Sequence, residues 1–309
     1  MKVQITAPDK FTLEQESLLE MHSFLNLVNV LIGNIRLIEM IVNRENCFPK
    51  STEILLGIME HLRGSEDALK YLDSLPTGES IQKNIYQEFF AVRKAHAKVE
   101  ENIWQQSENI FDGIFEILDI RIAEIKARQK PAFWQSWSFE EIEKSLREVF
   151  HVIALNSRGK FGVAFDPATR GKNDYLVTIK IESSTPGRLL MPPILNDSIR
   201  DLAANARKYS KPGTDICISL QQTEEMLTLD ISDQGRGIPE KEIDQVVFFG
   251  IRGSNTFPEE TKGGGFGLTK AWCFTHHYGG RMWIDSTLNV GTTVTLRIPV
   301  PASNADTEK

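Results

Sequence analysis

The chain changes its pattern near residue 130, and this change constrains the fold more than any other feature of the sequence. Before it, apolar residues recur at helical spacing and glycine is scarce, which is typical of packed helices. After it, short runs alternate apolar and polar residues and most of the 21 glycines occur, as expected for strands joined by turns. The sequence therefore predicts a helical region followed by a region built around a sheet.

In the first region, residues 1–130, we expect an all-helical bundle. Helices are predicted at about 12–43 and 52–72, and a nearly continuous pattern over 81–128 indicates one or two long helices. The first and last helices could pair as a hairpin, which would leave residues 46–97 as inserted helices. The fold class is therefore α+β, with a bundle preceding the second region.

Residues 131–302 are expected to form an α/β sandwich, in which helices cover one face of a mixed sheet. Ser138 and Glu141 have the spacing of a capping box, which predicts a helix that begins there and runs to about Ala154. The strands are predicted at 161–166, 175–182, 215–222, 226–233, 281–287 and 292–300, with further helices at 192–210 and 265–279. The tail, residues 303–309, is expected to be disordered.

Composition limits the class of protein. A net charge of −7 argues against sequence-independent binding of nucleic acid, which needs a basic face. The N-terminus has no apolar core of a signal peptide, and the most apolar run, "FLNLVNVLIGNIRLIEMIV", includes Asn34, Arg36 and Glu39. This run therefore predicts a helix buried in protein, and we expect a cytoplasmic protein without a membrane span.

One helical stretch, "DLAANARKYS", carries a group of polar side chains at helical spacing. Asp201 and Asn205 lie one turn apart on the same face, and Lys208 and Tyr209 follow one turn later. A carboxylate, an amide oxygen, an ammonium and a phenol suit a hydrated Mg²⁺ ion and the phosphates that it bridges. The alternative is the solvated face of a surface helix.

Three later stretches add complementary features. In "DQGRGIPEKE", Asp233 follows a strand and can accept a hydrogen bond from an exocyclic amine, while Gly235 and Gly237 let the backbone approach a flat ring. In "KGGGFGL" a run of glycines opens a helix, which favours phosphate binding, although flexible loops have the same composition. In "NVGTTVTLRIP", Thr292 could place a hydroxyl near the acid.

In their order, spacing and flanking strands, these four stretches resemble the ATP-binding domain of the GHKL superfamily, and within it the histidine kinases of two-component systems. The resemblance covers about residues 138–301 and implies a GHKL (Bergerat) ATP-binding fold. "DLAANARKYS" is similar to the N box, "DQGRGIP" to the first glycine box and "KGGGFGL" to the second.

The resemblance implies ATP and Mg²⁺ as cofactors and gives roles to individual residues. Asn205 would coordinate Mg²⁺, Lys208 and Tyr209 would contact phosphates, and Asp233 would bind the adenine amine. Residues 247–262 would form a mobile lid from which Arg252 reaches the phosphates. The other residues implied at the nucleotide are Asp201, Gly235, Gly237, Ile238, Gly263, Gly265, Phe266, Gly267, Leu268 and Thr292.

The first helix contains "HSFLNLVNVLIGNIRLIE", which is similar to the H box of histidine kinases. The similarity implies that His22 is the phosphoacceptor and that Asn26 is a second catalytic residue. Family members usually place Asp or Glu directly after the histidine, where this chain has Ser23. Because a hydroxyl is a poor base at neutral pH, phosphorylation of His22 would depend on a carboxylate from elsewhere. The alternative is that His22 is an ordinary surface histidine.

The resemblance implies a histidine kinase that acts as a homodimer through its helical bundle. It would pass the phosphoryl group to an aspartate of a response-regulator receiver domain, and its input would come from an upstream sensor protein or through the inserted helices. Two alternatives remain open at this point. One is a degenerate GHKL protein that binds nucleotide as an adaptor or phosphotransfer scaffold. The other is a GHKL serine/threonine kinase or a phosphatase-biased relative.

Overall fold

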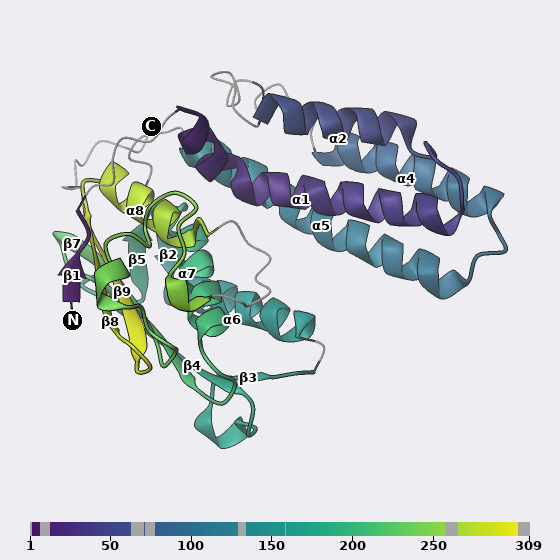
Figure 1. Ribbon diagram of the computed structural model, residues 1–309. Coiled ribbons are helices and arrows are strands. Elements are labelled where there is room, and N and C mark those ends of the chain that lie inside the picture. The colour runs from purple at the N-terminus through teal and green to yellow at the C-terminus, as the bar shows by residue number, and fades with distance from the viewer. Residues whose placement is uncertain are drawn as a thin grey trace. The chain divides into compact units, whose positions relative to one another are not determined.

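The computed structural model describes residues 2–6, 13–62, 71, 78–128, 134–157, 159–256 and 265–301. The chain divides into two compact units (Figure 1), Phe11–Lys130 and a second unit that combines Met1–Lys10 with Pro131–Lys309. The predicted fold class, a helical N-terminal region followed by a mixed sheet with helices, is confirmed. One assignment differs, because residues 1–10 belong to the unit that contains the sheet.

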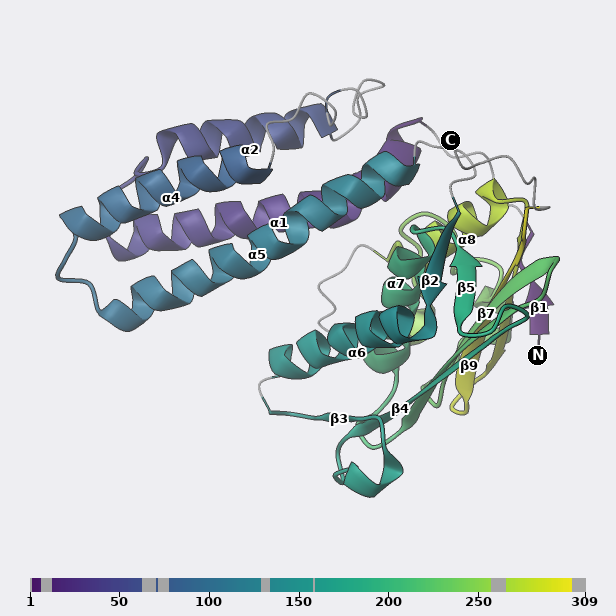
Figure 2. The same cartoon turned by 180° about the vertical axis from the view of Figure 1, so that it is seen from behind.

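The helical unit contains four helices whose bounds are described. They are α1 (Leu13–Ile41), α2 (Pro49–Leu62), α4 (Gly78–Ala95) and α5 (Glu101–Arg128). The long pattern over 81–128 thus forms two helices. α1 contacts α5 and α2, and α4 contacts α2 and α5, so the four surround one core, as both ribbon views show (Figures 1 and 2).

The core of this unit follows from the spacing of apolar residues. On α1, Met21, Phe24, Val28, Ile35 and Ile38 are buried at intervals of three, four and seven residues, which places them on one face. Burial of each such side chain contributes roughly 1.5–3 kcal/mol. Packing of this face therefore stabilises the unit more than helix propensity does.

Part of α1 also has the length and composition of a membrane-spanning helix. Among the described residues, Phe24–Ile41 is the segment that meets both criteria. In this structure one face of the segment packs in the helical core, and the side chain of Asn34 is buried there as well. The Asn34 Nδ2 donates a hydrogen bond to the Ser107 carbonyl oxygen at 2.9 Å, which links α1 to α5.

The second unit is built on a seven-stranded sheet with the strand order β1-β8-β9-β7-β6-β4-β3. Its strands are β1 (Lys2–Gln4), β3 (Val163–Ala164), β4 (Tyr175–Ser183), β6 (Asp215–Gln222), β7 (Met226–Asp233), β8 (Arg281–Thr287) and β9 (Gly291–Pro299). The pairs β3/β4 and β4/β6 are parallel and the others are antiparallel, so the sheet is mixed.

Three helices pack on this sheet, and the two ribbon views place them on one side of it (Figures 1 and 2). They are α6 (Phe139–Asn156), α7 (Leu195–Tyr209) and α8 (Gly267–His277). Burial alternates along the central strands, with Ile216, Ile218 and Leu220 of β6 fully buried and the residues between them partly exposed. This alternation places one apolar face of the sheet under the helices.

Three strands were missed by the sequence analysis. β1 pairs antiparallel with β8, and the buried Ile5 extends the contact through its N–H, which donates to the Met282 carbonyl oxygen at 2.9 Å. This pairing is the reason that the first residues lie with the sheet. β2 (Gln135–Ser138) and β5 (Arg188–Met191) form a separate two-stranded sheet.

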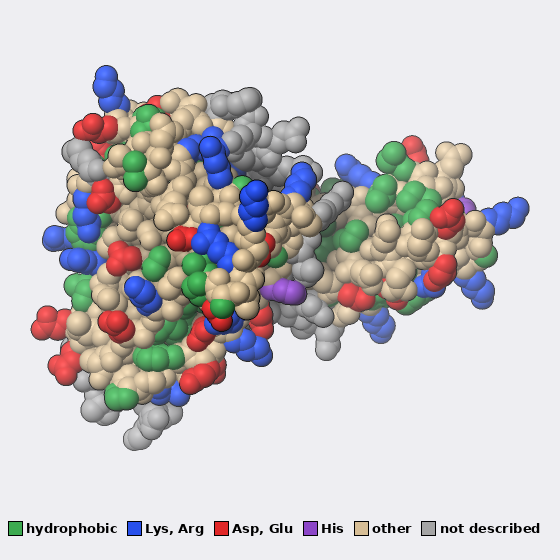
Figure 3. Space-filling view, turned by 90° about the horizontal axis from the view of Figure 1, so that it is seen from below, with side chains coloured by type: hydrophobic (Ala, Val, Ile, Leu, Met, Phe, Trp, Pro, Cys, Tyr) green, Lys and Arg blue, Asp and Glu red, His purple; other side chains and the backbone are tan. Residues whose placement is uncertain are grey.

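The capping box that begins α6 is confirmed. The Ser138 N–H donates to Glu141 Oε2 at 2.8 Å, and the Glu141 N–H donates to Ser138 Oγ at 3.2 Å. On the surface shown in Figure 3, acidic and basic side chains are interspersed over both parts of the chain. An interspersed pattern gives no extended basic stripe on this face.

Candidate functional site

α7 and α8 meet where the sequence analysis placed the N box and the second glycine box. Apolar residues of α7, such as Ile199, Leu202 and Ala206, are buried, while Asp201 and Asn205 lie half-buried one turn apart. A methyl group on Gly267 would lie 2.9 Å from Asn205 Nδ2 and 3.5 Å from Asp201 Cβ. Glycine therefore allows the start of α8 to contact the polar face of α7.

An ion pair crosses the same contact. Lys270, in the first turn of α8, places its Nζ 3.2 Å from Asp201 Oδ2, and the two side chains are 12% and 37% exposed. The sequence analysis assigned no role to Lys270. The available signal was a lysine three residues after Gly267, which had to lie in the first turn of the predicted helix.

Asp233 is the last residue of β7, and its carboxylate is mostly buried. The Gly235 N–H donates to Asp233 Oδ1 at 2.8 Å, and Thr292 of β9 lies opposite Asp233 in the sheet. Burial raises the pKa of Asp233 to about 6, although hydrogen bonds from the backbone of Gly235 and Thr292 act in the opposite direction. Above that pH the site contains an ionised acceptor with little access to water.

The glycines of the first glycine box hold this loop against two other elements. A methyl group on Gly235 would lie 2.5 Å from the Tyr209 carbonyl oxygen, and one on Gly237 would overlap with the Thr287 carbonyl oxygen. Gly237 also has φ +67°, a conformation that favours glycine. The Arg236 N–H donates to the Tyr209 carbonyl oxygen at 3.1 Å, which fastens the loop to the end of α7.

Ser286 on β8 contacts two further predicted site residues, Ile238 and Thr292. Its Oγ accepts a hydrogen bond from the Ile238 N–H at 2.8 Å and lies 2.9 Å from Thr292 Oγ1. Thr292 is therefore held next to Asp233 by both backbone pairing and a side-chain contact. Ser286 was not predicted, because only the pairing of β8 with β9 brings it to this position.

The beginning of the predicted lid is attached to the glycine boxes. The Asn255 Nδ2 donates to the Gly237 carbonyl oxygen at 2.9 Å, and Arg236 Nη1 donates to the Asn255 carbonyl oxygen at 2.8 Å. The side chain of Arg252 passes close to Gly265, where an added methyl group would lie 3.3 Å from its Nε. Gly263 and residues 257–262 of the predicted lid lie outside the described residues.

Two predicted apolar residues flank the start of α8. The Phe266 ring packs against the Phe249 ring with a centroid distance of 4.7 Å, and Leu268 is half-buried in the first turn. Lys208 and Tyr209 end α7, with Lys208 Nζ 5.1 Å from the centre of the Tyr209 ring. The structure thus brings together residues from α7, β7, α8 and β9 that are far apart in the sequence.

The side chains in this cluster suit a nucleotide with a metal ion bound largely through its phosphates. The Asn205 amide and the Asp201 carboxylate supply oxygen atoms one helical turn apart, next to the glycines that begin α8. Within the described ranges, no group of three His, Cys, Asp or Glu side chains is arranged to hold a metal ion. The buried Asp233 acceptor is suited to an exocyclic amine.

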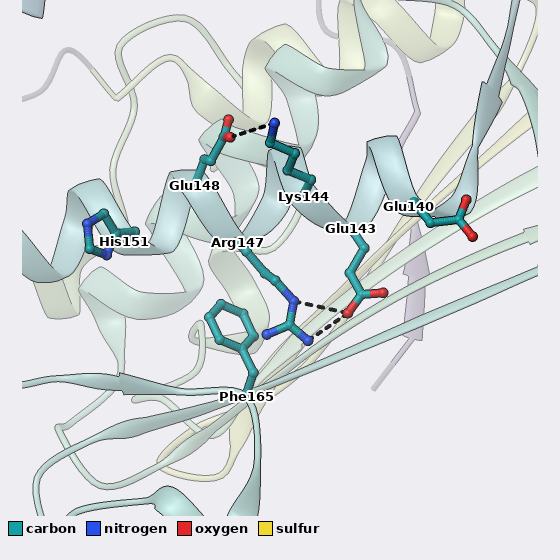
Figure 4. A pocket seen from close by; sticks show the side chains of 7 residues that line it. All are labelled: Glu140, Glu143, Lys144, Arg147, Glu148, His151 and Phe165. Atoms are coloured by element: carbon teal, nitrogen blue, oxygen red, sulfur yellow. Dashed lines mark hydrogen bonds and ion pairs between the residues drawn. The ribbon is translucent and has the colours of Figure 1, made fainter.

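A separate hollow lies on the outer face of α6 (Figure 4), and no predicted site residue lines it. Arg147 pairs with Glu143, and Lys144 pairs with Glu148, each across one helical turn. The Arg147 guanidinium lies over the Phe165 ring at 4.3 Å. Such pairs are typical of a solvated helix surface, and they assign no ligand to this hollow.

The predicted phosphoacceptor residues belong to the helical unit. His22 and Asn26 lie one turn apart on α1, and the Asn26 side chain is exposed. The side chains of His22 and Ser23 lie outside the described part of the structure. The roles of His22 and Asn26 therefore stay predictions.

Residues 192–302 match the family of histidine kinase-, DNA gyrase B-, and HSP90-like ATPases. The chain is 34% identical over 98 residues to sensor histidine kinase YvrG of Bacillus subtilis, a match that covers 32% of this chain and 17% of that protein. It is 31% identical over 185 residues to the adaptive-response sensory kinase SasA of Synechococcus elongatus, a match that covers 52% of this chain and 47% of that protein. The solved mycobacterial sensor histidine kinase MprB aligns with 53% of this chain and 97% of that chain, with 20% identity and a TM-score of 0.39. The chain spans less than half the length of YvrG and SasA.

Proposed function

We propose that this chain, whose residues 192–302 belong to the family of histidine kinase-, DNA gyrase B-, and HSP90-like ATPases, is a protein-histidine kinase. It binds ATP with Mg²⁺, phosphorylates His22 and passes the phosphoryl group to a response-regulator aspartate. The observation that carries the proposal is the meeting of distant motifs at α7, where Asn205 lies against Gly267 and Tyr209 against Gly235. The kinase names of the relatives support it.

Adenine binds at the end of β7 in this proposal. The Asp233 carboxylate accepts a hydrogen bond from the exocyclic amine, and Gly235 and Gly237 let the loop after Asp233 pack closely against Tyr209 and Thr287, which fixes its position beside the ring. Thr292, held by Ser286, adds a hydroxyl next to the carboxylate. The Ile238 N–H donates a hydrogen bond to Ser286 Oγ, which holds the loop after β7 against β8.

The phosphates lie toward α7 and the start of α8 in the same proposal. Mg²⁺, when bound, neutralises the phosphate charge that develops during transfer. Asn205 is the residue that would hold the ion, while Lys208, Tyr209 and Arg252 contact phosphate oxygens. Gly265 and Gly267 let the backbone approach closely, and the N–H groups at the start of α8 favour an anion.

The transfer step forms a bond between an imidazole nitrogen of His22 and the γ-phosphorus and breaks the bond from that phosphorus to the oxygen of ADP. The imidazole must also lose its ring proton when the bond to phosphorus forms, and Ser23 is a poor base for accepting that proton. A carboxylate from another part of the protein must therefore accept the proton. Asn26, one turn from His22, orients the ring.

Homodimer formation through the helical unit is part of the proposal. Val30, Leu37 and Met40 of α1 are large apolar residues with exposures of 49%, 48% and 77%, which favours contact with a second copy. The negative net charge supports a partner other than nucleic acid. We further propose a cytoplasmic location without a membrane span, and an upstream sensor protein as the source of input.

Labelling with γ-phosphate-labelled ATP and Mg²⁺ tests the proposal on the full chain. We expect an acid-labile phosphoryl group that His22→Ala abolishes and that His61→Ala, an exposed histidine of the same unit, leaves unchanged. ATP binding without labelling would favour the adaptor or scaffold. An acid-stable phosphoryl group would favour a serine/threonine kinase, and release of phosphate from a regulator without labelling would favour the phosphatase-biased relative.

A further inference from the structure

The ion pair between Lys270 and Asp201 joins two elements of the proposed nucleotide site. Lys270 Nζ on α8 lies 3.2 Å from Asp201 Oδ2 on α7, and only 12% of the lysine side chain is exposed. Gly267, one turn before Lys270, contacts both Asp201 and Asn205. Lys270 therefore lies where α8 meets the polar face of α7 that also carries Asn205, the residue that would hold Mg²⁺ in the proposed function.

A carboxylate at this position has an electrostatic consequence. Asp201 lies on the same face as Asn205 and one turn away, so an uncompensated negative charge there would repel a polyphosphate. The Lys270 ammonium group, 3.2 Å from Asp201 Oδ2, offsets most of the negative charge of Asp201. The low exposure of Lys270 reduces screening by water and salt, which strengthens the effect.

We propose that Lys270 is a nucleotide-site residue that masks the charge of Asp201 and thereby permits polyphosphate binding beside it. This role rests on the proposed function. Lys270 acts through Asp201 and so is a positioning residue. The pair also holds the start of α8 against α7, which keeps Gly267 in contact with Asn205.

Equilibrium binding to the full chain tests this role without any need for kinase activity. Displacement of a fluorescent ATP analogue gives the Kd of ATP, ADP and adenosine, each with and without Mg²⁺. We expect Lys270→Gln to weaken ATP and ADP by about tenfold, which corresponds to about 1.4 kcal/mol, and to leave adenosine unchanged. Lys270→Arg, which keeps the charge, should bind within about threefold of wild type.

The double variant Asp201→Asn with Lys270→Gln distinguishes masking from direct contact. If Lys270 acts by masking, removing the carboxylate restores the affinity for ATP without Mg²⁺ to within about threefold of wild type. Asp201→Asn alone should bind ATP without Mg²⁺ at least as tightly as wild type, because the repelling charge is gone. Lys180→Gln, an exposed lysine on β4, is the matched control and should change nothing.

Three results would overturn the role of Lys270. These are unchanged ATP affinity in Lys270→Gln, an equal loss of adenosine affinity, which indicates general damage, and a double variant as weak as Lys270→Gln alone. Thermal unfolding of each variant shows whether it is folded. Failure of the wild-type chain to bind any nucleotide would instead overturn the proposed function, so the two failures are distinguishable.

Discussion

Asp233 is a mostly buried acid at the position that we propose for adenine, and burial raises its pKa. Its folded-state pKa of about 6 is above the ordinary value of 3.8. A carboxyl group of this kind contributes stability below pH 3.8, and the contribution is lost as the pH rises through about 6. Burial of the acid therefore destabilises the nucleotide-free protein near neutral pH.

We predict that Asp233→Asn changes how stability depends on pH. Between pH 4 and pH 7, the unfolding free energy of wild type should fall relative to that of the variant by up to about 3 kcal/mol, since one pKa unit corresponds to about 1.4 kcal/mol. Urea unfolding of both proteins at several pH values measures the difference. Asp230→Asn, at another aspartate of the same strand, is the control. A difference independent of pH would contradict the prediction.

Ser23 is the residue at which the chain departs from the histidine kinases that it resembles. If the missing carboxylate limits phosphoryl transfer, Ser23→Glu should raise the initial rate of self-labelling at saturating ATP, because a base then follows His22 directly. We expect at least a severalfold increase, and Ser23→Gln, which has a similar shape but no base, should give none. An unchanged or lower rate in Ser23→Glu would show that another group already accepts the proton.

Individual site residues differed in how far sequence could identify them. Asn205, Asp233 and Gly267 could be proposed as site residues from sequence because each lies in a short local pattern that also sets its secondary structure. Lys270 and Ser286 have no such pattern. Their positions depend on which elements pack together, namely α8 on α7 and β8 on β9.

At the scale of elements, Gly237 in the turn that follows β7 is constrained both by its backbone conformation and by a neighbouring carbonyl group. Gly237 and Gly250 have similar φ values, +67° and +71°, but an added methyl group at Gly237 meets the Thr287 carbonyl oxygen while one at Gly250 meets nothing within 4 Å. The two positions therefore separate the cost of the backbone conformation from the cost of a clash.

We predict that Gly250→Ala lowers the unfolding free energy by about 1 kcal/mol, the cost of the left-handed conformation alone. Gly237→Ala should cost at least about 2 kcal/mol more, because the loop must move away from the turn between β8 and β9. Gly237→Ala should also weaken ATP binding, because the displaced loop directly follows Asp233. Chemical unfolding and a binding titration measure both effects, and equal costs at the two sites would contradict the steric argument.

Strands that alternate over seven or eight residues were predictable, and short strands of three or four residues were not. The bounds of β6, β7 and β8 agree with the sequence prediction, since apolar and β-branched residues alternate along their full length. β1 has three residues and β2 and β5 have four each. Segments of this length carry too few alternations to distinguish a strand from a loop, and their partners are distant in sequence.

At the scale of the whole molecule, β1 gives the helical unit two covalent connections to the sheet unit. The chain leaves the sheet after β1, forms the helices from α1 to α5, and returns to the sheet unit at residue 131. Two connections restrict the relative motion of two units more than a single linker does. Pairing of β1 with β8 maintains the second connection.

We predict that release of β1 widens the range of distances between the units. Ile5→Asp should detach β1, because Ile5 is 5% exposed and its replacement would bury a charge. Gln4→Asp, on the exposed side of the same strand, is the control. Spin labels at Glu60 and Lys180, with the native cysteines replaced, report the distance distribution. Equal widths in the two variants would show that β1 does not restrict the motion.

The pairing of β1 with β8 also sets the order in which the protein is completed during synthesis. Lys2 and Gln4 leave the ribosome before the helices, but their partners Asp285 and Trp283 are made near the end of the described chain. The helical unit can bury its whole core while β1 waits unpaired, since its helices contact mainly one another. The β1 edge of the sheet can therefore close only after the helical unit has been made, by a segment that was made before that unit.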